Sequence, residues 1–141
     1  MTPTDVFRGS FDTALRNFFG THASSYVFVS SIPNVYQLWS TLQGNASARS
    51  TWKTFGICQS MLSSSNTEAT RQAVLAQERT YNTALAEVCA AYDRCRWDGG
   101  ATFGVSFAPS DVSTVDYFHP SAAGQAKLAA VTWAASYWPT R

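Results

Sequence analysis

The residues of this chain best suited to chemistry are Asp116 and His119, in the stretch 110–124. His119 is one of only two histidines, and the aspartate precedes it by three positions. On a loop, a carboxylate at this spacing can accept a hydrogen bond from the imidazole Nδ1–H and fix the tautomer, which leaves Nε2 free to take a proton from a nucleophile. The pattern Asp-x-x-His is short, and spacing alone favours the simpler interpretation of a solvated loop histidine beside a turn aspartate.

Predicted elements flank this loop on both sides. Residues 102–107 alternate apolar with small or polar side chains and predict a strand, at whose carboxyl end the loop begins. Ser121 is placed to cap a closing helix through residues 126–138, which are apolar and small apart from Lys127 and which Pro139 ends. Because ligands of open α/β sheets bind at the carboxyl ends of strands, the loop is expected at the functional edge.

The rest of the chain predicts a further alternation of helices and strands. Thr2 and Pro3 begin a phenylalanine-rich helix, and the apolar run 26–32 predicts a strand buried on both faces. The longest helix is expected over 67–92, with Asn82 interpreted as a satisfied amide on its surface. This order is an α/β pattern, but two parallel strands are too few for an independent doubly wound sheet.

Three stretches together resemble one family. Asp116-Tyr117-Phe118-His119-Pro120, followed by Ser121-Ala122-Ala123-Gly124-Gln125, resembles the last motif block of the SGNH/GDSL hydrolases. Val27-Phe28-Val29-Ser30-Ser31-Ile32-Pro33-Asn34 is similar to a late core strand of the secreted actinobacterial members, and Tyr81-Asn82-x-x-Leu85 fits in order. The resemblance spans essentially all 141 residues but covers only the second half of the family's domain. The Gly-Asp-Ser nucleophile block, the glycine block and the Gly-x-Asn-Asp block are expected upstream of Met1.

The resemblance implies that residues 1–141 are a partial SGNH domain, the C-terminal part of a flavodoxin-like three-layer α/β/α sandwich with a parallel sheet. It implies a serine ester hydrolase (esterase or lipase) acting on a small-molecule or lipid ester without metal or organic cofactor. His119 would act as general base and then acid, and Asp116 would orient it. Ser10 is not expected to be the nucleophile, because no strand precedes it. The isolated chain is therefore expected to be inactive until the missing N-terminal half completes it.

Composition limits the class of protein further. With 45% apolar, 14% aromatic and 13% charged residues, the chain is expected to fold around a core. A net charge of +1 without clustering provides no electrostatic footprint for nucleic acid or anionic membrane. The apolar stretch 128–138 is too short to span a bilayer. Residues 1–9 lack the apolar core of a signal peptide, although the family's parent proteins are secreted.

The cysteines predict one disulfide. Cys89 lies in the last turns of the long helix and Cys95 just past its end, so a chain reversal can bring their Cα atoms within the ~4.4–6.8 Å that a bridge needs. Cys58 is then free or pairs elsewhere, and a bond from Cys58 to one of the other two is the main rival. Few charged residues and Ser/Thr-rich loops, with the resemblance, favour an oxidised, secreted parent.

Other functions remain open from the sequence. A non-catalytic module could bind carbohydrate or protein through Trp39, Trp52 and Trp97, although core packing is the simpler role for Trp39 and Trp52. A metal site from Asp116, His119 and His22 is disfavoured, because His22 is expected at the opposite end of the sheet.

Overall fold

The computed structural model describes residues 1–138, which form a mixed α/β protein that is mostly helical. In chain order its elements are α1 (Thr4–Thr21), β1 (Val27–Val29), α2 (Val35–Leu42), α3 (Ala46–Thr54), α4 (Gln59–Leu62), α5 (Glu68–Ala90), β2 (Cys95–Trp97), the 3₁₀ helix η1 (Pro109–Asp111) and α6 (Ala122–Ala135). Of the helices in this described part, none is long and apolar enough to cross a membrane.

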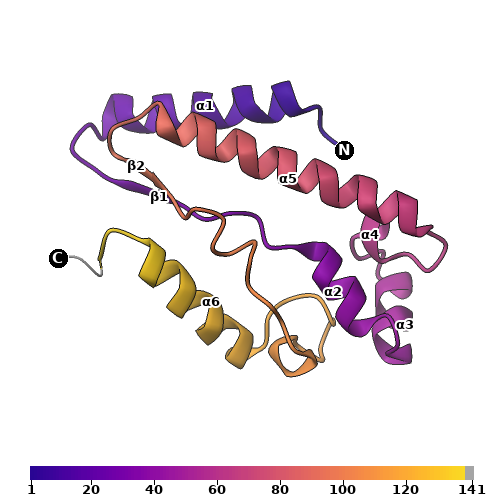
Figure 1. The fold of residues 1–141 in the computed structure, drawn as a ribbon. Helices are drawn as coiled ribbons and strands as arrows, with labels where there is room; N and C mark the ends of the chain where they lie inside the picture. The colour runs from indigo at the N-terminus through magenta and orange to yellow at the C-terminus, as the bar shows by residue number, and fades with distance from the viewer. Residues whose placement is uncertain (139–141) are drawn as a thin grey trace.

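The sheet within residues 1–138 is small and parallel. It has two strands, with Val27 of β1 opposite Cys95 of β2 and Val29 opposite Trp97. The strands run between the α1–α5 pair and α6 (Figure 1). The predicted α/β class and parallel pairing are confirmed, whereas this sheet alone does not make a flavodoxin-like sandwich.

The helices largely follow their sequence signals. The hydroxyl of Thr67 accepts a hydrogen bond from Thr70 N at 3.1 Å and begins α5, within a residue of the predicted start. Ser121 caps α6 as predicted, since its Oγ accepts from Gly124 N at 3.2 Å. The expected cap at Thr2 is wrong, because α1 begins at Thr4 with Pro3 in the N-cap position. Pro139, predicted to stop α6, lies outside the described residues.

The predicted strand at 102–107 is wrong, and the second strand is β2 instead. Asp98 Oδ2 accepts from Thr102 N at 3.0 Å, and its Oδ1 accepts from Gly100 N at 2.8 Å. Gly99 and Gly100 have φ values of 70° and 81°, a region open to glycine, so the chain turns sharply after Trp97. These contacts end the ladder and turn residues 102–107 away from the sheet.

The strand predicted at 26–32 is shorter than expected and less buried. Only Val27–Val29 pair with β2, and Val29 is the one buried residue of the three. Beyond the ladder, Ser31 N and Oγ both donate to Asp98 Oδ2, at 2.9 and 2.8 Å. A buried aspartate therefore ties the segment after β1 to the turn after β2.

Two apolar clusters form the core. One surrounds Val29, Leu85 and Cys89 and receives Phe7 and Phe11 of α1. The other lies around α2, α3 and α4 and consists of Trp39, Leu42, Ala48, Trp52, Met61, Leu62 and Val112. Through Val112 this second cluster reaches the loop that carries Asp116 and His119.

The predicted disulfide is confirmed. Cys89 and Cys95 are bonded with a Cα–Cα distance of 5.2 Å, which joins the last turn of α5 to the first residue of β2. Cys58 is a free, partly buried thiol, and burial raises its pKa.

Candidate functional site

Asp116 and His119 are in direct contact. Asp116 Oδ2 lies 2.5 Å from His119 Nδ1, and Oδ1 accepts from the backbone N–H groups of Phe118 and His119 at 3.0 and 3.1 Å. Burial works to raise the pKa of the Asp116 carboxyl, but the hydrogen bonds from the His119 ring and from the two backbone groups outweigh it and hold that pKa below its usual value. The carboxylate is thus ionised at neutral pH and orients the imidazole through Nδ1.

The other nitrogen of the ring is available for a reaction. The His119 side chain is 72% exposed, whereas that of Asp116 is 29% exposed. Nε2 makes no hydrogen bond to any group in residues 1–138. The pair is therefore arranged like a histidine base and its orienting carboxylate, with the imidazole exposed and the carboxylate on the more buried side.

A core tryptophan holds the loop between the two residues. Tyr117 has a φ of 56°, an uncommon left-handed conformation for a bulky residue. Its carbonyl oxygen accepts from Trp52 Nε1 at 3.0 Å, and its N–H donates to Ser113 O at 2.9 Å. Trp52, fully buried in α3, is therefore a positioning residue for the loop that no local sequence signal marks.

The base of the loop is closed by backbone contacts. Val112 and Pro120 form an antiparallel bridge, and Ser113 N donates to His119 O at 2.8 Å. Ser121 N donates to Asp111 O at 2.8 Å, and Ser121 Oγ donates to Ser110 O at 2.8 Å. The two ends of the 112–120 loop are therefore fastened to each other.

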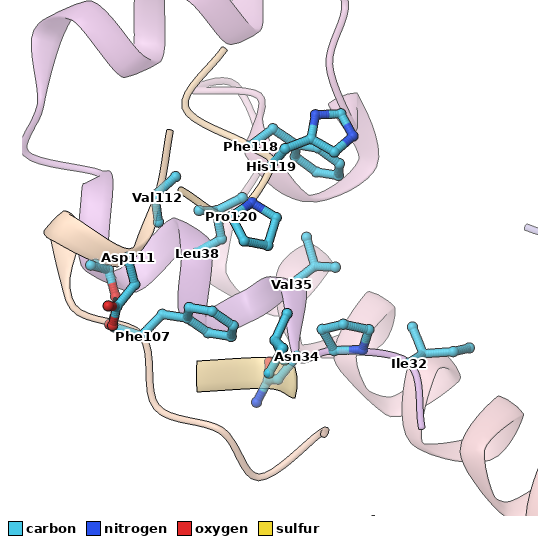
Figure 2. Close-up of a pocket in the computed structure, with 13 residues that line it drawn as sticks. Ile32, Asn34, Val35, Leu38, Phe107, Asp111, Val112, Phe118, His119 and Pro120 are labelled. Atoms are coloured by element: carbon cyan, nitrogen blue, oxygen red, sulfur yellow. Dashed lines mark hydrogen bonds between the residues drawn. The ribbon is translucent and has the colours of Figure 1, made fainter. Parts of the chain in front are cut away.

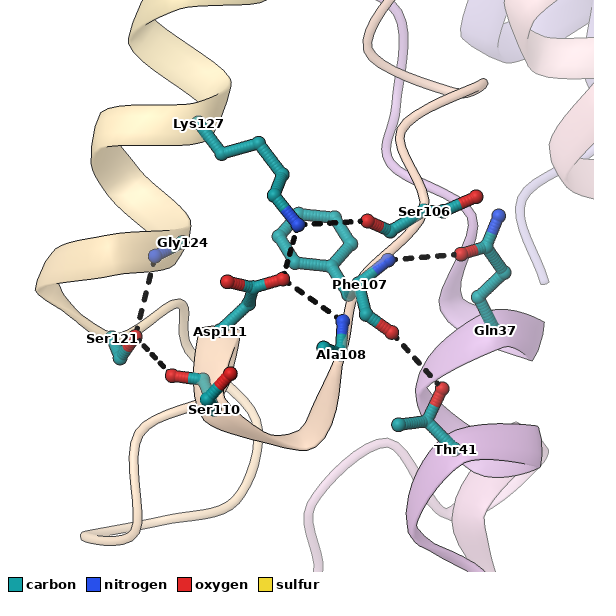
Figure 3. A network of polar contacts seen from close by, with 10 residues as sticks. All are labelled: Gln37, Thr41, Ser106, Phe107, Ala108, Ser110, Asp111, Ser121, Gly124 and Lys127. Carbon is teal, nitrogen blue, oxygen red and sulfur yellow. Dashed lines mark hydrogen bonds and ion pairs between the residues drawn. The ribbon is translucent and has the colours of Figure 1, made fainter.

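A second polar network joins the closed end of the 112–120 loop to α6 and α2 (Figure 3). Lys127 Nζ forms an ion pair with Asp111 and donates to Ser106 O at 3.1 Å, while Asp111 Oδ2 accepts from Ala108 N at 2.9 Å. Phe107 N donates to Gln37 Oε1 on α2 at 3.3 Å. The contact to Lys127 is the main cause that lowers the pKa of Asp111.

Polar side chains of α5 hold the segment that follows β1. Asn82 Oδ1 accepts from Ile32 N at 2.8 Å, and its Nδ2 donates to Ile32 O at 3.2 Å. Asn82 is therefore buried and binds both backbone groups of Ile32, and its interpretation as a surface amide is wrong. One turn earlier, Glu78 Oε1 accepts from Val35 N at 3.3 Å, and burial raises the pKa of Glu78 to about 7.

An apolar cavity of about 350 Å³ lies beside the Asp116–His119 pair (the dyad), with His119 in its wall (Figure 2). Its lining comes from the segment after β1, from α2, from the loop 107–120 and from α6: Ile32, Pro33, Asn34, Val35, Leu38, Thr41, Phe107, Asp111, Val112, Phe118, His119, Pro120 and Leu128.

The other sequence candidates lie elsewhere. His22 follows the end of α1, where its Nδ1 is 2.8 Å from Thr21 Oγ1, at the opposite side of the molecule from the 112–120 loop (Figure 1). No group of three or more His, Cys, Asp or Glu residues suited to a metal occurs in the described chain. Ser10 is on the exposed surface of α1. Trp39 and Trp52 are 8% and 0% exposed, so both pack in the core.

Comparisons of the chain with protein-family models, with curated protein sequences and with solved structures give no match.

Proposed function

We propose that this chain is the C-terminal part of an SGNH/GDSL-type serine ester hydrolase and carries the acid–base half of its active site. The observation that supports this most directly is the contact between Asp116 Oδ2 and His119 Nδ1, with Nε2 directed away from the carboxylate. Proton transfer is the chemistry for which this pair is arranged.

The reaction requires a serine from the N-terminal half of the domain. Its Oγ would bond to the ester carbonyl carbon while its proton passes to His119 Nε2. The imidazolium, stabilised by Asp116, would return that proton to the leaving alkoxide as the C–O bond breaks. A water molecule would then repeat both transfers and release the acid and the free serine. No step needs a metal or organic cofactor.

The edge of the sheet supports the same proposal. Val27 N donates to Arg94 O, and Asp98 N donates to Val29 O, so residues 27 and 29 face β2. Because residues alternate along a strand, the backbone N–H and C=O of Phe28 face the other edge, which no strand of residues 1–138 covers. Further parallel strands added there would build the flavodoxin-like sandwich and bring the nucleophile to the carboxyl end of β1. The disulfide is compatible with a secreted parent.

The alternative function, a module that binds carbohydrate or protein through tryptophans, is less well supported. Trp39 and Trp52 are buried, which leaves only Trp97 of the three candidates partly exposed. These three tryptophans therefore form no exposed aromatic surface, and the contact of Asp116 with His119 makes the ester hydrolase the better proposal.

The test is ester turnover after the missing half is supplied. We expect the purified chain alone to leave p-nitrophenyl acetate and butyrate at background, since removing the nucleophile from a serine triad costs on the order of 10⁶ in turnover. Co-expression with the N-terminal half, from the Gly-Asp-Ser strand through the Gly-x-Asn-Asp loop, should restore turnover. His119→Ala should abolish it, and Asp116→Asn should lower it by up to ~10⁴-fold.

His22→Ala is the matched control, because it removes the other histidine far from the dyad, and it should leave turnover unchanged. If a folded two-piece complex is active and His119→Ala is as active as the wild type, Asp116 and His119 are not the catalytic dyad and the proposal fails.

A further inference from the structure

The apolar cavity beside the dyad carries an inference about the substrate. His119 and Phe118 lie at one end of the lining, with Val112, Pro120 and Leu38 next to them (Figure 2). A ligand whose reacting group lies at His119 therefore has an apolar hollow within immediate reach. At about 350 Å³ the cavity is at the lower end of the range for small-molecule sites.

Apart from Nε2 of His119, the polar side chains in the wall already have partners within the protein. Asn34 Oδ1 accepts from Gln37 N at 3.3 Å, and Thr41 Oγ1 donates to Phe107 O at 3.4 Å. Asp111 is engaged by Ala108 N and by the ammonium group of Lys127. A ligand inside the cavity thus meets mainly carbon, and a hydroxyl-rich ligand would lose its water without gaining comparable hydrogen bonds.

The walls are held in place independently of any ligand. Val112 is part of the core cluster around Trp52, and Thr41 and Gln37 tie α2 to the backbone of Phe107. Leu128, which also lines the cavity, belongs to α6, which Lys127 joins to Asp111 and Ser106. These contacts shape the cavity without any bound ligand.

We infer that this cavity binds the hydrocarbon part of the acyl group, so that the substrates are esters of medium-length fatty acids rather than acetylated sugars. The assignment of an acyl group rests on the proposed function, whereas the affinity of the cavity for a hydrocarbon chain does not.

The first experiment tests binding to the chain without the N-terminal half, in a Phe28→Pro background that blocks the uncovered edge of β1 and leaves the cavity lining unchanged. Methyl-labelled Val and Leu residues are followed by NMR during titration with octanoate, butyrate and acetate. We expect saturable shifts at Val35, Leu38 and Val112 with octanoate, and affinity that falls roughly fourfold for each methylene removed. Contacts observed by NOE between the terminal methyl of octanoate and Val112 should place the chain inside the cavity.

Leu128→Trp fills the cavity and should weaken octanoate binding at least tenfold. The matched control is Ala129→Trp, which adds the same side chain at the exposed neighbouring position and should bind octanoate like the wild type. Shifts that do not saturate, the absence of the Val112 NOE, or equal binding by a folded Leu128→Trp variant would each overturn the inference.

The second experiment separates this inference from the proposed function. In the active two-piece enzyme, Leu128→Trp should lower kcat/KM for p-nitrophenyl octanoate at least tenfold more than for the acetate. If the wild-type complex is inactive while octanoate binds the chain, the proposed function fails and the hydrocarbon site remains. If the complex is active but Leu128→Trp leaves the preference for octanoate unchanged, or if the added half displaces octanoate, the acyl site is wrong and the proposed function remains.

Discussion

Glu78 is a buried carboxyl group whose ionisation is coupled to folding. Burial raises its pKa from the usual 4.5 to about 7, and the hydrogen bond from Val35 N and the nearby charge of Arg79 offset only part of this effect. Its oxygens accept from the first backbone N–H of α2, so it helps fix the segment between β1 and α2 that lines the cavity.

We predict that this carboxyl makes the protein less stable as the pH rises from about 4.5 to about 7. Because the pKa of Glu78 is higher in the folded than in the unfolded protein, protonation of Glu78 stabilises the folded state. This contribution is complete below about pH 4.5 and is lost as the pH rises through about 7. The loss amounts to at most about 1.4 kcal/mol per pH unit within this window. Urea unfolding at a series of pH values measures it. In Glu78→Gln, which keeps an acceptor oxygen without a charge, this slope should disappear, and an unchanged slope would contradict the prediction.

The position of α6 depends on Gly124, where this helix packs closely against the backbone of η1. A Cβ at Gly124 would lie 2.1 Å from the carbonyl oxygen of Asp111, whereas one at Gly9 in the middle of α1 would meet no atom within 4 Å. The same substitution therefore has opposite expected effects in the two helices.

Gly124→Ala should destabilise the protein by about 2 kcal/mol or more, because backbone must move to admit the methyl group. Gly9→Ala should stabilise it by about 0.5–1 kcal/mol through helix propensity. Denaturant midpoints of the two variants against the wild type measure both effects. A Gly124→Ala variant as stable as the wild type would show that α6 is not packed against η1 in this way.

The disulfide connects α5 to β2, the only strand that pairs with β1 in residues 1–138. With a sequence separation of 6, its loss should reduce the free energy of unfolding by about 2 kcal/mol, mainly by freeing the unfolded chain. Reductant should lower the urea midpoint of the wild type and of Cys58→Ala alike. It should have no effect on the Cys89→Ala/Cys95→Ala variant, and an effect there would assign the change to another group.

At the scale of the whole molecule, the uncovered edge of β1 is the feature most exposed to other chains. An open edge with free backbone groups is a template for strand addition, so the isolated chain should be oligomeric or poorly soluble. Phe28→Pro removes the outward N–H without removing a bond to β2, and it should restore a monomer. Phe28→Ala keeps that N–H and is the control.

Light scattering coupled to size-exclusion chromatography measures the mass of each variant. A wild-type chain that is monomeric at high concentration would contradict the prediction. Equal association of Phe28→Pro and Phe28→Ala would place the contact elsewhere, for example on the exposed Trp133 of α6.

The sequence by itself determined the features that depend on neighbours a few positions away. Local spacing allowed the contact of Asp116 with His119, the cap of α6 at Ser121 and the disulfide between Cys89 and Cys95, and the family resemblance favoured the first of these over a solvated loop histidine. In each case the partners are only three to six residues apart, so the local chain alone can bring them together.

Only the tertiary structure decided what depends on distant partners. Trp52 holds the carbonyl of Tyr117 from 65 residues away, and Asn82 holds Ile32 from 50 residues away. Residues 102–107 alternate like a strand, yet Asp98 turns them out of the sheet. The cavity likewise exists only where several elements meet. Local patterns do not record such contacts, because their energy comes from burial and hydrogen bonds that form only when the chain has folded.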